Sequence, residues 1–279
     1  MAVLENVLGI KTSIARIHRA LHALGLYEVL TVEEDPWNIG EPNARPRLYI
    51  LLIRADAAVA RGGVLDDHVK ALMQVCRSRS RVAPAKRLLL DNSPYVKESV
   101  STLRKPRGRT VLSASQGQTP KWRRQHAACH GIKLATPIAG LGEREASVLG
   151  IKLAERGLHN LTPECNIDLK RSLKFANWSK CVPTVTPGSK IVVGQLRRLV
   201  VPIEKCLLNS LPVHLVDWPG NFSNTDFANI GGNTMHAMVM AKIMLIALSL
   251  VDWSRPQASL PFQCGGVGKG VAPPRQIHI

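Results

Sequence analysis

The sequence predicts an α/β fold, and three features near its start support that prediction. Val3 and Leu4 have the character of the end of a buried strand. Across residues 11–24, apolar residues recur at three- and four-residue spacing, which predicts a helix with one buried face. A second strand is predicted at residues 27–32. The order strand, helix, strand is typical of α/β proteins.

Further elements follow along the chain. Gly25 is placed to end the first helix, and an apolar run predicts a strand at residues 47–54. Apolar periodicity predicts helices at residues 65–76 and 143–156. Two more helices are predicted at residues 202–208, with Pro202 at an early helical position, and at residues 234–250.

Size and charge limit the classes of protein to which the chain can belong. Its 279 residues, of which 45% are hydrophobic, suffice for one large domain or two modest ones. The 37 Lys and Arg against 20 Asp and Glu give a net charge of +17. Such an excess indicates DNA or another nucleic acid as partner, with an anionic membrane surface or plain solubility as alternatives. The longest apolar run, residues 237–251, contains Lys242 and is short for a membrane span, so we expect a buried helix and no membrane partner.

Cysteine usage and the first residues bear on compartment and metals. The six cysteines are scattered without a Cys-x-x-Cys pair, which argues against a zinc ribbon, and we expect no metal site. Glu5 and Asn6 interrupt the first apolar residues, so no secretory signal is predicted. We therefore expect a nuclear or cytoplasmic protein with reduced thiols.

The middle of the chain differs in character from both ends. Between Cys76 and Lys133, Lys and Arg are frequent and the acidic residues are Asp91 and Glu98. Several prolines and little periodicity predict a loop-rich or partly disordered segment. By contrast, residues 254–279 are rich in Gly and Pro and are expected to form a flexible tail.

Candidate DNA contacts lie within this basic segment. Residues 104–110 are similar to an AT-hook, in which Arg107 and Arg109 would lie along an A·T-rich minor groove, although Thr110 stands where the hook has Pro. A basic linker that contacts phosphates is the alternative. Trp122, followed by Arg123 and Arg124, suits stacking on an exposed base, or else packs locally.

Four separated motifs also occur in one order. Glu5-Asn6-Val7 follows the first strand, and Gly40-Glu41-Pro42-Asn43-Ala44-Arg45-Pro46-Arg47 leads into the third. Pro183-Thr184-Val185-Thr186-Pro187-Gly188 precedes Arg197-Arg198-Leu199, and Gly231-Gly232-Asn233-Thr234 enters the long apolar helix. In order and spacing they resemble the motifs of cytosine-5 DNA methyltransferases, over about residues 3–54 and 175–251. Asn43 stands where that family has Gln, and Val200 where it has Thr.

The resemblance implies a fold and a set of roles. The expected fold is the later part of a doubly wound, Rossmann-like methyltransferase sheet that uses S-adenosylmethionine, with an irregular basic target-recognition region. Glu5 would bind the target cytosine at N3, and Arg45 and Arg47 would stabilise charge near the base. The other implied residues are Asn6, Gly232, Asn233 and Thr234 for the cofactor, and Arg197 and Arg198 for DNA.

Each of these residues has a simpler alternative role. Glu5 can be a surface carboxylate or a helix-capping group. Arg45 and Arg47 can be a solvated pair at the start of a strand. Asn233 can be a helix N-cap, which is compatible with contact to a ligand.

Two parts of the family's machinery are not found in the sequence. The family's nucleophile lies in a Pro-Cys dipeptide before Glu-Asn-Val, but none of the six cysteines here follows a proline. The Gly-rich cofactor loop is not found either. We therefore expect an incomplete chain that is inactive alone, either a truncated product or a degenerate relative, with a second chain supplying the missing half as a candidate partner. The alternatives are a non-catalytic DNA-binding remnant and a relative of RNA cytosine-5 methyltransferases.

The predicted domain division follows the motifs. Residues 1–54 would be part of the catalytic α/β domain, and residues 55–174 the basic recognition region. Residues 175–253 would return to the catalytic domain, with residues 254–279 as the tail.

Overall fold

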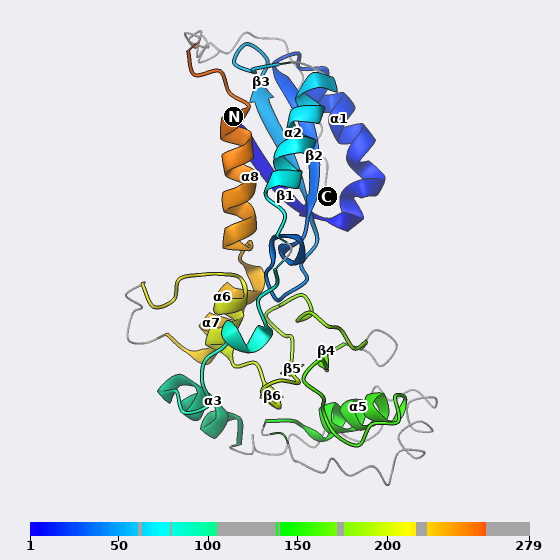
Figure 1. Cartoon of the computed structure of the whole chain (residues 1–279), viewed down its shortest axis with the longest axis vertical. Coiled ribbons are helices and arrows are strands. Elements are labelled where there is room, and N and C mark those ends of the chain that lie inside the picture. The colour runs from blue at the N-terminus through cyan, green and yellow to red at the C-terminus, as the bar shows by residue number, and fades with distance from the viewer. Residues whose placement is uncertain are drawn as a thin grey trace, which may run out of the picture.

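The structure, a computed structural model, describes residues 1–60, 63–78, 80–104, 138, 140–171, 176–215 and 222–254. These residues form two lobes that follow one another along the long axis of the molecule (Figure 1). The first lobe contains β1, β2, β3, α1, α2 and α8, and the second contains the remaining labelled helices and strands.

The first lobe is built on a three-stranded sheet. Its strands are β1 (Ala2–Val7), β2 (Tyr27–Glu34) and β3 (Arg47–Arg54), in the order β1-β3-β2 with both pairs antiparallel. The six inner residues of β3 are all buried, because this central strand is covered on both faces. That double burial explains why β3 is a continuous apolar run rather than an alternating one.

Helices cover both faces of this sheet. On one face α1 (Ile14–His22) packs through Ile14, Ile17 and Leu21. On the other face lie α2 (Gly63–Val75) and α8 (Ala237–Ser249), which contribute Leu65 and Ile243 to the core. The α/β prediction is therefore confirmed for this lobe.

The pairing of the strands differs from that of a doubly wound sheet. Every neighbouring pair among the described strands is antiparallel. The link from β2 to β3, residues 35–46, holds only the 3-10 turn Pro36–Ile39 and no crossover helix. A parallel pair needs a crossover, usually a helix, whereas a short link permits the antiparallel return seen here.

A buried ion pair fixes α8 to the sheet. The Lys242 ammonium on α8 contacts the Glu34 carboxylate at the end of β2, and both side chains are almost fully buried. Glu34 also accepts hydrogen bonds from the Asp35 N–H at 2.9 Å and from the Asn38 amide at 2.8 Å. Lys242 donates a further bond to the Met73 carbonyl of α2 at 3.3 Å. One charged pair thus joins a strand to two helices.

Among the described residues, the second lobe holds a smaller antiparallel sheet and four α-helices. The strands are β4 (Asn166–Asp168), β5 (Ile191–Val193) and β6 (Arg198–Leu199), in that order. The helices are α3 (Pro94–Arg104), α5 (Glu143–Ala154), α6 (Pro202–Leu208) and α7 (Asn224–Asn233). In one core α5 packs on the small sheet, and in another α6 and α7 pack together.

Several expectations about helices need correction. The region predicted to be loop-rich contains α3, and the segment before Thr234 forms α7, which was not predicted. The long apolar helix begins at Ala237 rather than Thr234. Its N-cap is His236, whose Nδ1 accepts from the Val239 N–H at 3.4 Å, so Asn233 ends one helix instead of capping the next.

Packing also groups the chain differently from the predicted domain division. Helix α2, beyond the boundary predicted at residue 55, contributes Leu65 and Val69 to the core of the first lobe. Ala176, Val192 and Leu199 pack with α5 in the second lobe, although residues 175–253 were expected to rejoin the catalytic domain. Of that segment, α8 is the part that packs on the large sheet.

Within the described ranges, one stretch is long and apolar enough to cross a membrane, residues Asn224–Ser249. It is a candidate by length and composition alone, and buried core helices share both properties. Here the stretch comprises α7 and α8, separated by a break at residues 234–236. Lys242 inside it is held by Glu34.

Replacing Lys242 with Met should lower the free energy of unfolding by about 3 kcal/mol or more, because the Glu34 charge would stay buried without its partner. Adding Glu34→Gln should recover most of that loss, since Gln still accepts bonds from Asp35 and Asn38. Urea unfolding followed by circular dichroism measures both variants. A single variant as stable as the double variant would show that the pair does not hold α8.

Candidate active site

The predicted acid and one of the predicted arginines are in contact on neighbouring strands. Glu5 of β1 lies opposite Tyr49 of β3, and Arg47 is two residues from Tyr49 on the same face of that strand. The Glu5 Oε1 atom is 3.2 Å from the Arg47 Nε atom. The side chains are 13% and 15% exposed, respectively, so the pair is largely but not wholly shielded from solvent.

Arg45 has a different environment, at the junction of the two lobes. Its guanidinium is buried and donates through Nη1 to the Val185 carbonyl at 2.8 Å and the Gly232 carbonyl at 3.5 Å. Its backbone N–H donates to Asp35 Oδ1 at 3.1 Å. Burial lowers the pKa of Arg45, and the nearby positive charge of Arg47 adds to that effect. Arg45 therefore joins three segments that are distant in the sequence.

Local sequence explains how Arg45 reaches this position. Asp35 caps the 3-10 turn Pro36–Ile39 by accepting from the Trp37 N–H at 3.0 Å, and Pro36 starts the turn. Gly40 ends it with φ +88°, where a Cβ atom would also lie 2.5 Å from the Ser80 carbonyl oxygen. The chain then turns back as an extended segment that carries Ala44 and Arg45 toward the second lobe.

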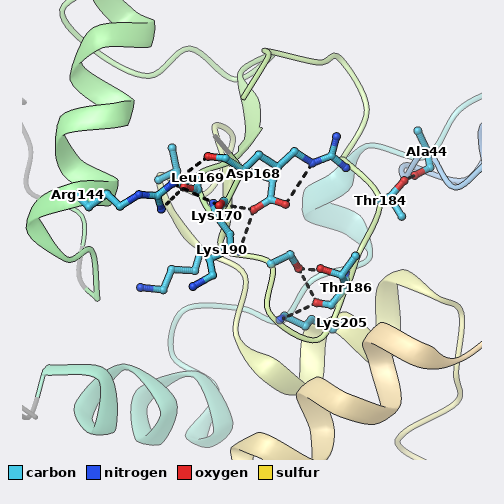
Figure 2. Close-up of polar contacts among 11 residues, drawn as sticks. Ala44, Arg144, Asp168, Leu169, Lys170, Thr184, Thr186, Lys190 and Lys205 are labelled. Atoms are coloured by element: carbon cyan, nitrogen blue, oxygen red, sulfur yellow. Dashed lines mark hydrogen bonds and ion pairs between the residues drawn. The ribbon is translucent and has the colours of Figure 1, made fainter. Parts of the chain in front are cut away.

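That extended segment lies beside the third motif. The Ala44 N–H donates to the Val182 carbonyl at 2.9 Å, and the Val182 N–H donates to the Pro42 carbonyl at 2.8 Å. The Thr184 hydroxyl donates to the Ala44 carbonyl at 2.8 Å, as Figure 2 shows. Two motifs recognised separately in the sequence thus form one two-stranded connection between the lobes.

The glycines of the fourth motif serve close packing. A Cβ atom at Gly231 would lie 2.6 Å from Lys205 Cβ, and one at Gly232 would lie 2.0 Å from the Pro187 nitrogen. Glycine at both positions lets α7 approach α6 and the Thr186–Pro187 turn. It also leaves the Gly232 carbonyl within reach of Arg45.

The predicted cofactor residues are arranged less favourably than the acid and the arginines. Asn233 is exposed at the end of α7, and the Thr234 N–H closes that helix by donating to the Ile230 carbonyl at 2.9 Å. Asn6 is exposed on β1, where its Oδ1 accepts from the Val7 N–H at 2.8 Å. Since Gly232 is used in packing, the described residues provide no glycine cradle that fits S-adenosylmethionine, and we assign no step to that cofactor.

The Arg198 guanidinium is bonded to groups within the protein. All five of its N–H donors are used within the protein, in a bidentate pair with Glu204 at 2.8 Å, a contact to Asp91 at 2.6 Å, and bonds to the Leu89 and Leu199 carbonyls. The predicted DNA contact of Arg198 is therefore not supported, because no donor is left for a phosphate. Its neighbour Arg197 is exposed in the turn before β6, with φ +51°.

The other predicted DNA contacts lie outside the described residues. These are Arg107, Arg109, Arg123 and Arg124, together with Trp122. They stay predictions, as does the contact of Arg197 with DNA.

Sequence reasoning did not identify His236, which lies beside this site. Its side chain is buried, and its Nε2 is 3.5 Å from the Ser210 hydroxyl. Burial, together with the positive charges of Arg45 and Arg87, lowers the pKa of His236 to about 4. The ring is therefore neutral at pH 7. No local pattern marks it, because both its burial and the neighbouring charges come from segments far away in the sequence.

Two other buried groups beside the glycines have altered acidity. Lys205 donates to the Thr186 and Pro187 carbonyls at 3.1 and 2.7 Å (Figure 2), and burial lowers its pKa to about 8. Burial raises the pKa of the adjacent Cys206 thiol to about 11. A thiol of that pKa is protonated at neutral pH and is a poor nucleophile.

Comparison with known proteins gives only distant similarities. No family model and no curated protein matches the sequence. Among solved structures, the chain is similar to the Dnmt2 methyltransferase of S. pombe, with 14% identity, a TM-score of 0.48, and coverage of 88% of this chain and 66% of that one. The Entamoeba histolytica methyltransferase EhMeth has 14% identity, a TM-score of 0.42, and coverage of 88% and 62%. The chain thus spans slightly less than two thirds of each structure, and this degree of likeness assigns neither a family nor a function.

Stability should fall on acidification through the titration of His236. Above its ordinary pKa of 6.5 the ring is neutral in both the folded and the unfolded state. Between pH 6.5 and pH 4 the unfolded chain binds a proton that the folded chain does not, so stability falls by up to about 1.4 kcal/mol per pH unit. In the variant His236→Gln, the free energy of unfolding should depend less steeply on pH between pH 6.5 and pH 4. Urea unfolding at intervals of half a pH unit measures this dependence. Equal slopes would mean that His236 is not held neutral.

Proposed function

We propose that this chain is a cytosine-5 methyltransferase-type protein that acts on nucleic acid, with DNA as the substrate. The supporting observation is the meeting in space of residues from separate motifs. Glu5 contacts Arg47 at 3.2 Å, and Arg45 reaches the Gly232 carbonyl at 3.5 Å. The motifs suggested this convergence through their order alone, since the segments that carry them are far apart in the chain.

The chemistry of the reaction accounts for the two side chains on β1 and β3. In the proposed reaction a thiolate adds to C6 of cytosine, and C5 then accepts the methyl group. Loss of the C5 proton expels the thiolate and restores the ring. Negative charge develops on the ring at N3 and the neighbouring oxygen as the thiolate adds. The Glu5 carboxyl group, when protonated, would donate to N3, and the Arg47 guanidinium would stabilise charge on the oxygen.

The proposal assigns different roles to the two arginines, because their environments differ. Arg47 lies beside the acid and keeps some exposure, so a small opening of the Glu5–Arg47 pair would admit a base. Arg45 is buried and bonded to the second lobe, so it acts as a positioning residue. The target base has to leave the duplex to reach this pair, because both side chains are largely covered.

The nucleophile and the methyl donor are not assigned to any residue of this chain. None of the six cysteines follows a proline, and the high pKa of Cys206 keeps it in the thiol form. This chain would contribute Glu5, Arg45 and Arg47 to the site. The thiolate would come from outside the described residues.

Duplex DNA with one unpaired cytosine should bind about tenfold more tightly than the same duplex with an unpaired thymine, given the discrimination of one good hydrogen-bonded base contact. Glu5→Gln should keep this preference, because its amide still donates to N3. Glu5→Ala should lose it, whereas Arg47→Ala should weaken the binding of both duplexes, because cytosine and thymine carry the same ring oxygen next to N3. Fluorescence anisotropy with labelled duplexes measures each affinity.

The matched control for this experiment is Arg54→Ala, which removes a guanidinium at the other end of β3. It should weaken both duplexes equally. A wild-type chain that does not distinguish cytosine from thymine would contradict the proposal. Stronger competition by transfer RNA than by duplex DNA would move the substrate from DNA to RNA.

The purified chain should transfer no labelled methyl group from S-adenosylmethionine to DNA, because none of its six cysteines follows a proline and burial raises the pKa of the Cys206 thiol. Tritium incorporation into DNA that contains cytosine is the measurement, with a characterised cytosine-5 methyltransferase as the positive control. Incorporation above background that is lost in Cys206→Ser would show that the buried thiol is activated after all.

A further inference from the structure

A pocket in the second lobe lies next to the connection between the lobes and has no assigned role. Its volume is about 320 Å³, which is within the range of roughly 300–1,000 Å³ for small-ligand sites. Ala44, Pro183 and Thr184 line it from the connection. The remaining lining residues come from the β4 end and the following segment, and are Asp168, Arg171, Asn177, Trp178 and Ser179.

The wall that carries Asp168 and Arg171 is held in place by a hydrogen-bond network. Asp168 Oδ1 accepts from the Lys170 and Lys190 N–H groups, both at 3.0 Å. The Arg144 guanidinium donates to the carbonyls of residues 169–171 at 3.2–3.5 Å, and Figure 2 shows it reaching across to that turn. The turn is therefore fixed before any ligand arrives.

This network also positions a cation at the pocket. The Arg171 Nε atom lies 3.5 Å from Asp168 Oδ2, and the Arg171 side chain is 44% exposed. Asp168 is nearly buried, and its carboxylate is already engaged by two backbone N–H groups and by Arg171. Arg171 is thus the charged group that remains accessible, and it favours an anionic ligand over a metal ion.

Trp178 supplies a fixed aromatic surface. Its Nε1 donates to the Lys152 carbonyl at 2.9 Å, and the ring packs against the core beneath α5. The Arg156 guanidinium lies over the ring at 5.7 Å from its centroid, a loose contact that a stacked base would have to share or displace. The exposed Asn177 next to it has an amide that can both donate and accept. An indole, an amide and a guanidinium in one pocket match the ring, the edge and the phosphate of a nucleotide.

The pocket and the candidate active site share one short segment of chain. Ala44 lines the pocket, and the next residue, Arg45, bonds to the Gly232 carbonyl. Successive residues of an extended segment point to opposite sides. One short segment therefore has the pocket on one side and the positioning arginine of the site on the other.

We propose that this pocket binds one unstacked nucleotide of the nucleic acid, flanking the target base, with its ring on Trp178 and its phosphate on Arg171. The inference rests on the proposed function for the identity of the polymer. Binding of a nucleotide by the pocket, however, is inferred from Arg171, Asn177 and Trp178 alone.

Titrating the full chain with nucleoside monophosphates, followed by tryptophan fluorescence, tests the pocket directly. The monophosphates should quench the emission, whereas ribose 5-phosphate, which has no base, should not. Trp178→Phe should abolish most of the quenching. Arg171→Ala should weaken binding of the monophosphates about tenfold and leave that of the uncharged nucleosides unchanged.

Lys170→Ala is the matched control, because it removes a neighbouring charge that does not line the pocket. Circular dichroism confirms that each variant folds. Asn177→Ala provides a second, exposed substitution in case Trp178→Phe destabilises the core, and it should also weaken binding of the monophosphates. Quenching that is absent in the wild type, or unchanged in both Trp178→Phe and Arg171→Ala, would overturn the proposal.

The outcome separates this inference from the proposed function. Arg171→Ala should weaken the affinity for the cytosine-containing duplex while the preference for cytosine over thymine persists. Suppose that the wild-type chain binds the cytosine and thymine duplexes equally while monophosphates still quench its emission. That result would contradict the methyltransferase proposal but would support the pocket as a nucleotide site. A preference for the cytosine duplex without quenching by monophosphates would contradict the proposal for the pocket alone.

Discussion

The buried guanidinium of Arg45 is the contact on which the arrangement of the two lobes depends. A charge removed from water has to be compensated, and here two backbone carbonyls, Val185 and Gly232, replace the solvent. Residue 232 is a glycine because a Cβ atom there would collide with Pro187 and push that carbonyl away. Burial is the main cause that keeps His236 neutral, and the positive charge of Arg45 adds to its effect.

Arginines in motifs are used in different ways in this fold. Arg47 stays beside Glu5 at a partly exposed position, where it can meet a substrate. Arg198 instead satisfies the buried Glu204 carboxylate, which also accepts from the Leu89 and Val201 N–H groups at 2.8 and 2.9 Å. The number of internal acceptors that each guanidinium finds decides whether it stabilises the fold or remains available for a ligand.

The elements that could be predicted from sequence are those with a strong local pattern. The bounds of β3 and α6 agree with the prediction, because one is an uninterrupted apolar run and the other begins at a proline. Strands β4, β5 and β6 were missed because two or three residues are too few to show a period of two. α7 was not predicted because Asn and Gly, which are poor helix formers, make up half of its residues.

More of the candidate active site than of the pocket could be predicted from the sequence. The acid and the arginines belong to motifs whose order implies a common location, whereas the pocket is assembled by tertiary packing of short segments. The two are nevertheless coupled through the segment that carries Ala44 and Arg45. A displacement that opens the Glu5–Arg47 pair by moving this segment would also change the wall of the pocket, because Thr184 holds the Ala44 carbonyl. Occupation of the pocket and access to the acid are therefore expected to be linked mechanically, through the same backbone that Arg45 anchors.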